Sequence, residues 1–490
     1  GGGAGERRAA GTGRCPPGAG GGGPEAATRR KRCRWRMAVG LVVLLAALAY
    51  AFVPTRTRVL ADGPAPDAAL IERGRYLAAA GDCTACHTRP GGKPFAGGLP
   101  VASPLGNIYS TNITPDKDTG IGGYSLDDFD RAVRHGIAPD GRTLYPAMPY
   151  PSYARITDED VRALHAYFLH GDIAPVKEAN KPVEITWPLS MRWPLAIWRK
   201  TFAPQADAVA FDASRYSDAQ LARGAYLVQG LGHCGSCHTP RGFALQEKAL
   251  DESGTAYLSG GQIIDGWNAV NLRGNPADGL GRWSEQDIVD TLQTGRNAHS
   301  TVVGTPMADV VVHSTQKLTE EDLRAMAVYL KQLPGSGHDP SSFAASDATA
   351  RKLQAGINDS RGAELFVDNC AACHRTDAHG YKDVFPAIAG NPTVLADDPT
   401  SVVRLLLHGS ALPSTDKRPS NLGMPGFAER LSDEEIAQLA TFIRQEFGNT
   451  APAVDAGLAR KVRAQLQKEQ KHAATAHDPT NASDDEAPAK

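Results

Sequence analysis

Three pentapeptides in this 490-residue chain share the pattern Cys-x-x-Cys-His, which is typical of covalent attachment of c-type haem. Two thiols three residues apart lie on one face of a helical turn and can add to the two vinyl groups of one porphyrin edge. The histidine that follows then lies under the ring and binds the iron. The motifs use six of the eight cysteines. We expect three haem c groups, held by Cys83, Cys86, Cys234, Cys237, Cys370 and Cys373, with His87, His238 and His374 as proximal iron ligands.

Other uses of Cys-x-x-Cys fit the sequence less well. A structural zinc site needs about four protein ligands, whereas these pairs are far apart in the sequence and each looks self-contained. A thioredoxin-like site needs one pair near a βαβ pattern, which the sequence lacks. Structural disulfides would leave the histidine that follows each pair unexplained.

Methionine commonly supplies the sixth iron ligand of an electron-transfer haem c and raises its potential. Three of the six methionines lie next to a proline, 8 to 12 residues before the capping residue of the last helix of each repeat. We predict that Met148, Met307 and Met424 are the distal ligands, each on a stiff loop. His135 and His408 are the alternatives, but both end a predicted helix, where a histidine also interacts with the carbonyl dipole. Met326 falls in an apolar helical stripe and is expected in the core.

The elements that must position these residues recur three times. A short amphipathic helix with Arg-Gly precedes each haem motif, at Arg73, Arg223 and Arg361. A middle helix follows, bounded by helix-capping and helix-ending residues at 125–136 and 284–295, and at about 400–409. A last helix starts at Thr157, Thr319 or Ser432, each with an acidic residue three positions later, which resembles a capping box. The sequence therefore predicts a mainly α protein made of three tandem modules.

The amino-terminal part is organised differently. We interpret residues 1–36, rich in Gly and Arg, as a disordered leader or sequence upstream of a start at Met37. Residues 37–60 contain the apolar run Ala38–Val53, which suits a signal peptide or a membrane anchor. A signal-peptidase site is conceivable at Val59-Leu60-Ala61, but the intervening arginines favour an uncleaved anchor. The basic cluster at 29–36 orients the modules towards the periplasm.

The predicted division of the rest of the chain follows these repeats. The Trp/Pro-rich linker is expected either to pack between modules or to contact another subunit or the membrane surface. The predicted segments are module one at 67–174, the linker at 175–213, module two at 214–335, module three at 355–448 and a charged tail at 449–490.

Charge excludes one class of partner. Residues 37–490 carry 43 Lys and Arg against 52 Asp and Glu, a net charge of −9. An acidic chain of this kind does not suit nucleic-acid binding.

The chain resembles the tri-haem cytochrome c subunit of bacterial membrane-bound dehydrogenases, over about residues 70–447. Those enzymes include quinoprotein alcohol and aldehyde dehydrogenases and flavin-dependent gluconate and sorbitol dehydrogenases. The resemblance rests on residues 81–88, 110–116 and 145–150, on the linker from Trp187 to Trp198, and on the later haem motifs. It implies three class-I-like cytochrome c domains.

The resemblance also implies a role and partners. In that family the subunit takes electrons from a large dehydrogenase subunit with a flavin or quinone cofactor, accompanied by a small subunit. It passes them to ubiquinone at the periplasmic face of the cytoplasmic membrane. On this reading the chain is not catalytic alone.

Two other functions remain open from the residues. A stand-alone multihaem carrier to an oxidase or reductase would need no partner-specific surface, so the Trp-rich linker weighs against it. A haem enzyme such as a peroxidase needs an open distal iron site, which three distal methionines would close.

Overall fold

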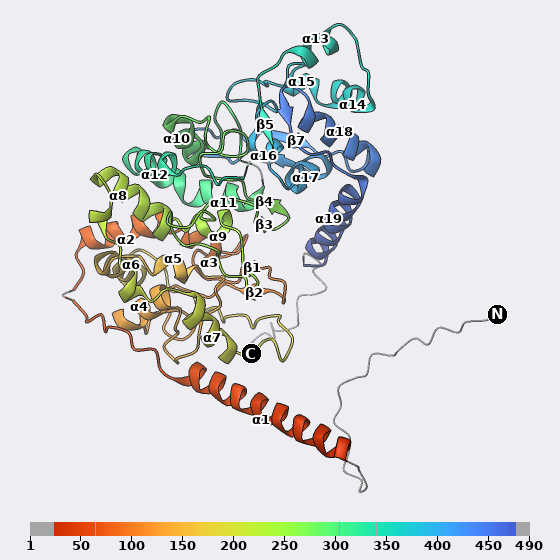
Figure 1. The fold of residues 1–490 in the computed structure, drawn as a ribbon. Coiled ribbons are helices and arrows are strands. Elements are labelled where there is room, and N and C mark those ends of the chain that lie inside the picture. The colour runs from red at the N-terminus through yellow and green to blue at the C-terminus, as the bar shows by residue number, and fades with distance from the viewer. Residues whose placement is uncertain (1–23, 64, 303, 339–340, 477–490) are drawn as a thin grey trace, which may run out of the picture.

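The computed structural model describes residues 24–476 apart from 64, 303 and 339–340. The fold is mainly α, as the sequence predicts, with four short antiparallel strand pairs in the described part. Three groups of helices follow one another along the body, and a long N-terminal helix projects from it (Figure 1). We name the groups module 1 (α2 to α6), module 2 (α8 to α12) and module 3 (α13 to α18).

Module 1 has the predicted order of first helix, haem motif, middle helix and last helix. The side chain of Ser125 caps the middle helix in a complete capping box, and Gly136 ends it in the left-handed conformation. Its elements are α2 (Ala68–Ala80), α3 (Cys83–His87), β1 (Pro100–Val101), β2 (Ile108–Tyr109), α4 (Leu126–His135), α5 (Tyr150–Tyr153) and α6 (Asp158–His170).

Module 2 repeats this order after the linker, which holds α7 (Trp193–Phe202) and two 3-10 turns, η1 (Ala206–Ala208) and η2 (Ala213–Arg215). Ser284 and Gly295 bound the middle helix in the same way as in module 1. The elements of module 2 are α8 (Ala219–Tyr226), the π-helix η3 (Leu227–Leu231), α9 (Gly235–His238), β3 (Ile263–Ile264), β4 (Trp267–Asn268), α10 (Glu285–Thr294), α11 (Thr305–His313), η4 (Thr315–Lys317) and α12 (Glu320–Gln332).

Module 3 is larger than residues 355–448. Strand β5 (Ser342–Phe343) pairs with β8 (Asn449–Thr450), and α19 (Ala456–Ala476) packs on the module. Leu466 of α19 belongs to its core, so this stretch is no free tail; Asn481 and beyond lie outside the described residues. The other elements are α13 (Ala348–Gln354), α14 (Arg361–Asn369), α15 (Ala371–His374), α16 (Pro392–Leu395), α17 (Thr400–His408), β6 (Gly409–Ala411), β7 (Gly423–Pro425) and α18 (Asp433–Gln445).

The recurring Arg-Gly pair marks where the first and last helices of a module cross. A Cβ added at Gly74 would lie 1.9 Å from the Ala163 carbonyl oxygen, and one at Gly224 would lie 2.0 Å from that of Ala325. At Gly362 the added atom would be 2.6 Å from Phe442 Cβ. Only glycine permits this approach of the two helices.

Modules 1 and 2 form one unit, whereas module 3 has a core of its own. A single hydrophobic cluster joins Leu77 and Phe168 of module 1 to Leu227 and Leu323 of module 2. A second cluster around Phe366 fills module 3. The three repeats are therefore not equivalent in space.

Modules 1 and 2 each place one tyrosine at the start of the last helix of the other module, and we call Tyr76 and Tyr226 the exchanged tyrosines. The Tyr76 hydroxyl donates to Asp322 Oδ2 at 2.5 Å and accepts from the Thr319 N–H at 3.2 Å. Tyr226 of module 2 makes the same pair of bonds with module 1: its hydroxyl donates to Asp160 and accepts from the Thr157 N–H. At these two N-termini the capping box is thus completed by a tyrosine of the other module. Among the last helices, only the one starting after Ser432 forms the reciprocal box within itself.

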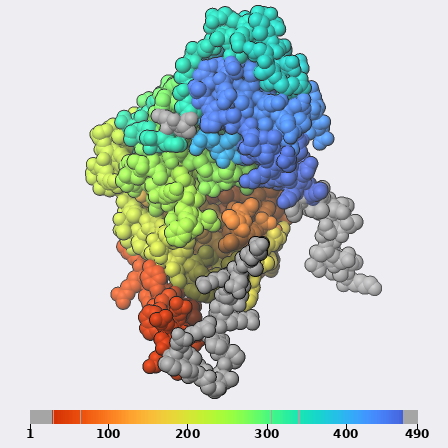
Figure 2. All heavy atoms as spheres, turned by 45° about the vertical axis from the view of Figure 1, so that its right-hand side comes forward, coloured from red at the N-terminus to blue at the C-terminus, as the bar shows by residue number. Residues whose placement is uncertain are grey.

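The amino-terminal helix α1 spans Pro24–Phe52, so the expectation of disorder is wrong for residues 24–36. Helix-forming Ala, Arg and Lys residues dominate that stretch, and nothing in it breaks the helix. From residue 31 to 53 every residue but Ala51 is at least partly exposed. Figures 1 and 2 both show α1, in red, projecting from the body.

Candidate haem-binding sites

Each haem motif carries its histidine on a one-turn helix directly after the module's first helix. His87 Nδ1 lies 2.6 Å from the Thr111 carbonyl oxygen, and His238 Nδ1 lies 2.7 Å from that of Val270. His374 Nδ1 lies 2.9 Å from the Pro386 carbonyl oxygen. A carbonyl can only accept, so each Nδ1 carries the hydrogen and each Nε2 keeps a lone pair. A hydrogen bond of this kind, made by the ring nitrogen that does not bind the metal, orients a metal-binding histidine.

The surroundings of these side chains suit a neutral imidazole and a thioether. Burial lowers the pKa of His87, His238 and His374. Burial also raises the pKa of the Cys83 and Cys234 thiols to about 12, whereas reactive or metal-binding cysteines have lowered values. In the part of the chain that the structure describes, no three His, Cys, Asp or Glu side chains are grouped to hold a metal ion. The raised thiol pKa values argue against a thiol-redox site, because reactive cysteines have lowered pKa values.

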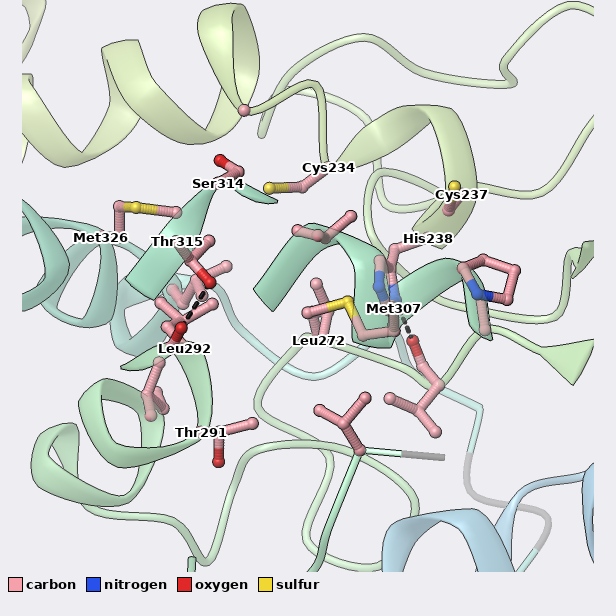
Figure 3. A pocket seen from close by; sticks show the side chains of 18 of the residues that line it. Cys234, Cys237, His238, Leu272, Thr291, Leu292, Met307, Ser314, Thr315 and Met326 are labelled. Atoms are coloured by element: carbon pink, nitrogen blue, oxygen red, sulfur yellow. Dashed lines mark hydrogen bonds between the residues drawn. The ribbon is translucent and has the colours of Figure 1, made fainter. Parts of the chain in front are cut away.

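The second motif opens onto an apolar cavity of about 190 Å³ (Figure 3). Cys234, Cys237 and His238 line one side of it. Other parts of the lining come from outside module 2: Ala80 and Asp82 belong to module 1, and Pro392 and Thr393 to module 3. The site of the second motif therefore lies where all three modules meet.

The predicted distal methionines are half-buried against the same cores as the cysteines. Met148 lies in a loop, as expected. Met307 does not: Pro306 occupies the first turn of α11, where proline is tolerated, and Met307 follows it in the helix. Met424 lies in strand β7, opposite Ser410 of β6. The expectation of a stiff loop is therefore wrong for these two.

Met307 lines the cavity together with His238, the histidine with which the sequence pairs it; Met326 also lines the cavity, which the sequence did not predict. Figure 3 shows them entering from different helices, α11 and α12. Met326 is only 2% exposed and belongs to the core, as expected. His135 is buried beside Asp130 and Arg134 at the end of α4.

The residues present fit a haem. Two half-buried thiols, an oriented imidazole and an apolar cavity match its vinyl edge, iron and ring. Trp283 also lines the cavity, and its buried Nε1 has no hydrogen-bond partner among the described residues, so it is free to donate to an anionic group such as a propionate. When bound, haem c would supply a one-electron iron centre, and the fold supplies ligands and a low-polarity surround.

Sequence reasoning missed the carbonyl acceptors and the residues that join the first two motifs. Tyr153 donates to the Gly81 carbonyl at 2.8 Å, and its ring lies 5.6 Å from that of His233. It thus connects the residues just before the first and second motifs. A usable sequence signal was the asparagine that follows both Thr111 and Val270, because Asn112 and Asn271 stabilise the turns that present these carbonyls.

Comparison with known proteins agrees with these features. The cytochrome c family model matches residues 71–172 and 360–446. The gluconate 2-dehydrogenase cytochrome c subunit of Pantoea cypripedii is 54% identical over 397 residues, covering 80% of this chain and 89% of that protein. The cytochrome c subunit of alcohol dehydrogenase (quinone) from Gluconacetobacter polyoxogenes is 52% identical, covering 80% and 84%.

A third relative extends the range of substrates named in these proteins. The fructose dehydrogenase cytochrome subunit of Gluconobacter japonicus is 39% identical over 435 residues, covering 84% of this chain and 86% of that protein. Sequence motifs, histidine geometry and long matches at high identity agree. This chain belongs to the family of cytochrome c subunits of dehydrogenases.

Proposed function

We propose that this chain is a three-haem relay that carries electrons from a partner dehydrogenase to ubiquinone in the cytoplasmic membrane. The partner is a large subunit with a flavin or quinone cofactor, together with a small subunit, and it oxidises an alcohol, aldehyde or sugar acid. It removes two electrons from its substrate; with haem c bound, this chain would pass them on one at a time, and ubiquinone would take up two electrons and two protons. His87, His238 and His374 would bind the haem irons as proximal ligands, and Met148, Met307 and Met424 would supply the sixth ligands.

The observation that carries the proposal is the shared lining of the cavity at the second motif. Residues of modules 1 and 3 reach into this cavity, so a haem there would touch both neighbouring modules. Modules 1 and 2 are fixed to one another by a common core and by the exchanged tyrosines. A rigid arrangement around a central haem suits a relay more than three independent carriers.

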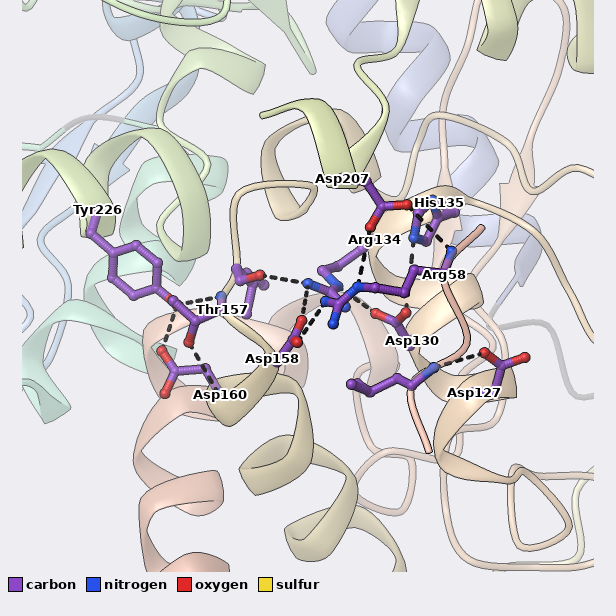
Figure 4. Close-up of polar contacts among 12 residues, drawn as sticks. Arg58, Asp127, Asp130, Arg134, His135, Thr157, Asp158, Asp160, Asp207 and Tyr226 are labelled. Carbon is purple, nitrogen blue, oxygen red and sulfur yellow. Dashed lines mark hydrogen bonds and ion pairs between the residues drawn. The ribbon is translucent and has the colours of Figure 1, made fainter. Parts of the chain in front are cut away.

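The segment that leads from α1 into module 1 supports an uncleaved anchor (Figure 4). Leu60 is 3% exposed in the core of modules 1 and 2, and its N–H donates to Asp127. Arg58 pairs with Asp158 at 2.6 Å, and Arg162 donates to the Ala61 carbonyl. Cleavage after Ala61 would remove Leu60, whose burial is worth about 1.5–3 kcal/mol.

Within the described residues one helix, at Lys31–Phe52, is long and apolar enough to cross a membrane. With the basic cluster on the inner side, its C-terminal end and the modules would face the periplasm. Protease added to spheroplasts should then degrade the modules. Carbonate extraction should leave the chain in the membrane, with residues before Leu60 present in its intact mass.

Reconstitution tests the function. The purified chain should bind three haems and oxidise no alcohol, aldehyde or sugar acid alone. With a candidate partner dehydrogenase added, its substrate should reduce the haems, and a ubiquinone analogue should then be reduced. Full-rate ubiquinone reduction by the dehydrogenase without this chain would contradict the proposal. Substrate or peroxide turnover by the isolated chain would favour a haem enzyme.

A further inference from the structure

Helix α7 buries a cation while its large apolar side chains stay partly exposed. Its one buried residue is a cation, Arg199, which donates to Thr55 Oγ1 at 2.7 Å. A surface helix of a soluble protein buries its apolar stripe and exposes its charges. Five large apolar residues of α7 instead keep part of their surface exposed: Trp193, Leu195, Ile197, Trp198 and Phe202.

Exposed apolar side chains continue around α7. Trp187 is 79% exposed and Phe243 is 93% exposed. The Phe243 ring lies 6.1 Å from that of Phe202, and Trp198 Nε1 donates to the Ala244 carbonyl at 2.7 Å, so the two segments form one surface. We define the α7 surface as α7 with its exposed neighbours Trp187, Leu189, Met191, Phe243 and Leu245.

The α7 surface lies at the end of α1. Lys200 Nζ donates to the carbonyl oxygens of Tyr50, Ala51 and Val53, which end the apolar run. These carbonyls lack helical partners, so the lysine both satisfies them and fixes α7 against the helix end. In Figure 1, α7 is the element of the body beside which α1 begins to project.

We propose that the α7 surface docks onto the periplasmic face of the lipid bilayer that α1 crosses. The inference rests on the proposed anchor, because an α1 that spans the bilayer places its C-terminal end, and α7 with it, at headgroup depth. Tryptophan and phenylalanine beside a lysine suit that layer, where aromatic rings lie between acyl chains and water. An interfacial face of this kind sinks about 5–10 Å into the headgroup boundary.

Photocrosslinking in lipid vesicles tests the docking. The full chain carries the photoreactive analogue p-benzoylphenylalanine at Phe243 or Trp187, in vesicles of phosphatidylethanolamine and phosphatidylglycerol. Leu44 in α1 serves as the lipid reference, and Ile357, an exposed apolar residue of module 3, as the water reference. After illumination, intact mass detects phospholipid adducts and gels detect protein crosslinks.

Docking predicts adduct yields at 243 and 187 comparable to that at 44, with none at 357. Adducts at 44 but none at 243 and 187 would overturn the docking and leave the anchor in place. Protein crosslinks at 243 would assign the surface to a second copy of the chain and overturn it too. Adducts at 243 without any at 44 would support docking and refute the anchor, whereas none at either position would refute both.

Discussion

Tyr76→Phe removes one hydroxyl from the interface between modules 1 and 2. That hydroxyl donates to the Asp322 carboxylate and accepts from the N–H of Thr319 at the start of α12. A hydrogen bond to a charged group contributes about 1.5–3 kcal/mol. The phenyl ring keeps the packing, so we expect the free energy of unfolding of the joined modules to fall by about 2 kcal/mol.

Urea unfolding measures this change, because the two separate cores should give two transitions. Module 3 has no tyrosine at the equivalent position; Glu364 stands there and pairs with Arg361 at the surface. Its transition is therefore an internal control. With a urea dependence of about 2 kcal/mol per molar, the midpoint of modules 1 and 2 should drop by about 1 M.

A double-mutant cycle separates the bond from general disturbance. Tyr76→Phe should cost clearly less in a background that already carries Asp322→Ala, because the hydroxyl then has no carboxylate partner and keeps only its bond from the Thr319 N–H. Tyr226→Phe, at the mirrored position facing Asp160, should lower stability by a similar amount. Equal shifts of both transitions, or an unchanged midpoint for modules 1 and 2, would refute the exchanged-tyrosine interpretation.

Three further outcomes follow from the site and its surroundings. Met307→Ala should abolish one third of the near-infrared methionine-to-iron band of the oxidised protein, and Met326→Ala should leave the band intact; the reverse result would reassign the ligand. Burial raises the pKa of Glu247 to about 7, offset in part by Arg241, so the folded protein holds a proton there that the unfolded chain releases above its ordinary pKa. Glu247→Gln should therefore stabilise the protein by up to about 3 kcal/mol at pH 8 and by little at pH 4, measured by thermal unfolding at both pH values. Burial acts to raise the pKa of Asp322, but its hydrogen bonds with Arg223 lower this pKa overall. The stabilisation that the Asp322 carboxylate contributes is therefore complete above the ordinary aspartate pKa and is lost as the pH falls below that value. Asp322→Asn should flatten the acid limb of the curve of stability against pH.

Local chemistry was predictable from the sequence because it is encoded at short range. Cys-x-x-Cys-His specifies thioethers and a proximal ligand within a single helical turn. Capping serines and ending glycines at 125–136 and 284–295 gave two middle helices correctly, since caps act on neighbouring backbone groups. The Arg-Gly pair also recurs for a local reason that only becomes visible when the helices cross at Gly74, Gly224 and Gly362.

Contacts between distant residues were decided by the tertiary structure. The tyrosine at 76 and 226, and glutamate at 364, read as a minor variation of one repeat. In the folded protein this difference determines which modules join, because only the tyrosines reach an N-terminus in the neighbouring module. The placement of Met307 and Met326 around one cavity, and the packing of α19 on module 3, likewise depend on elements that the sequence separates.

The role of residues 58–62 shows the same division. As a tripeptide, Val59-Leu60-Ala61 is compatible with a cleavage site and with a linker, because both accept small and apolar residues, and only the arginines before it favour the uncleaved form. Only the fold buries Leu60 and pairs Arg58 with Asp158, far away in the chain. Sequence determines what each residue can do chemically, and burial among residues from other segments determines which of those possibilities the protein uses.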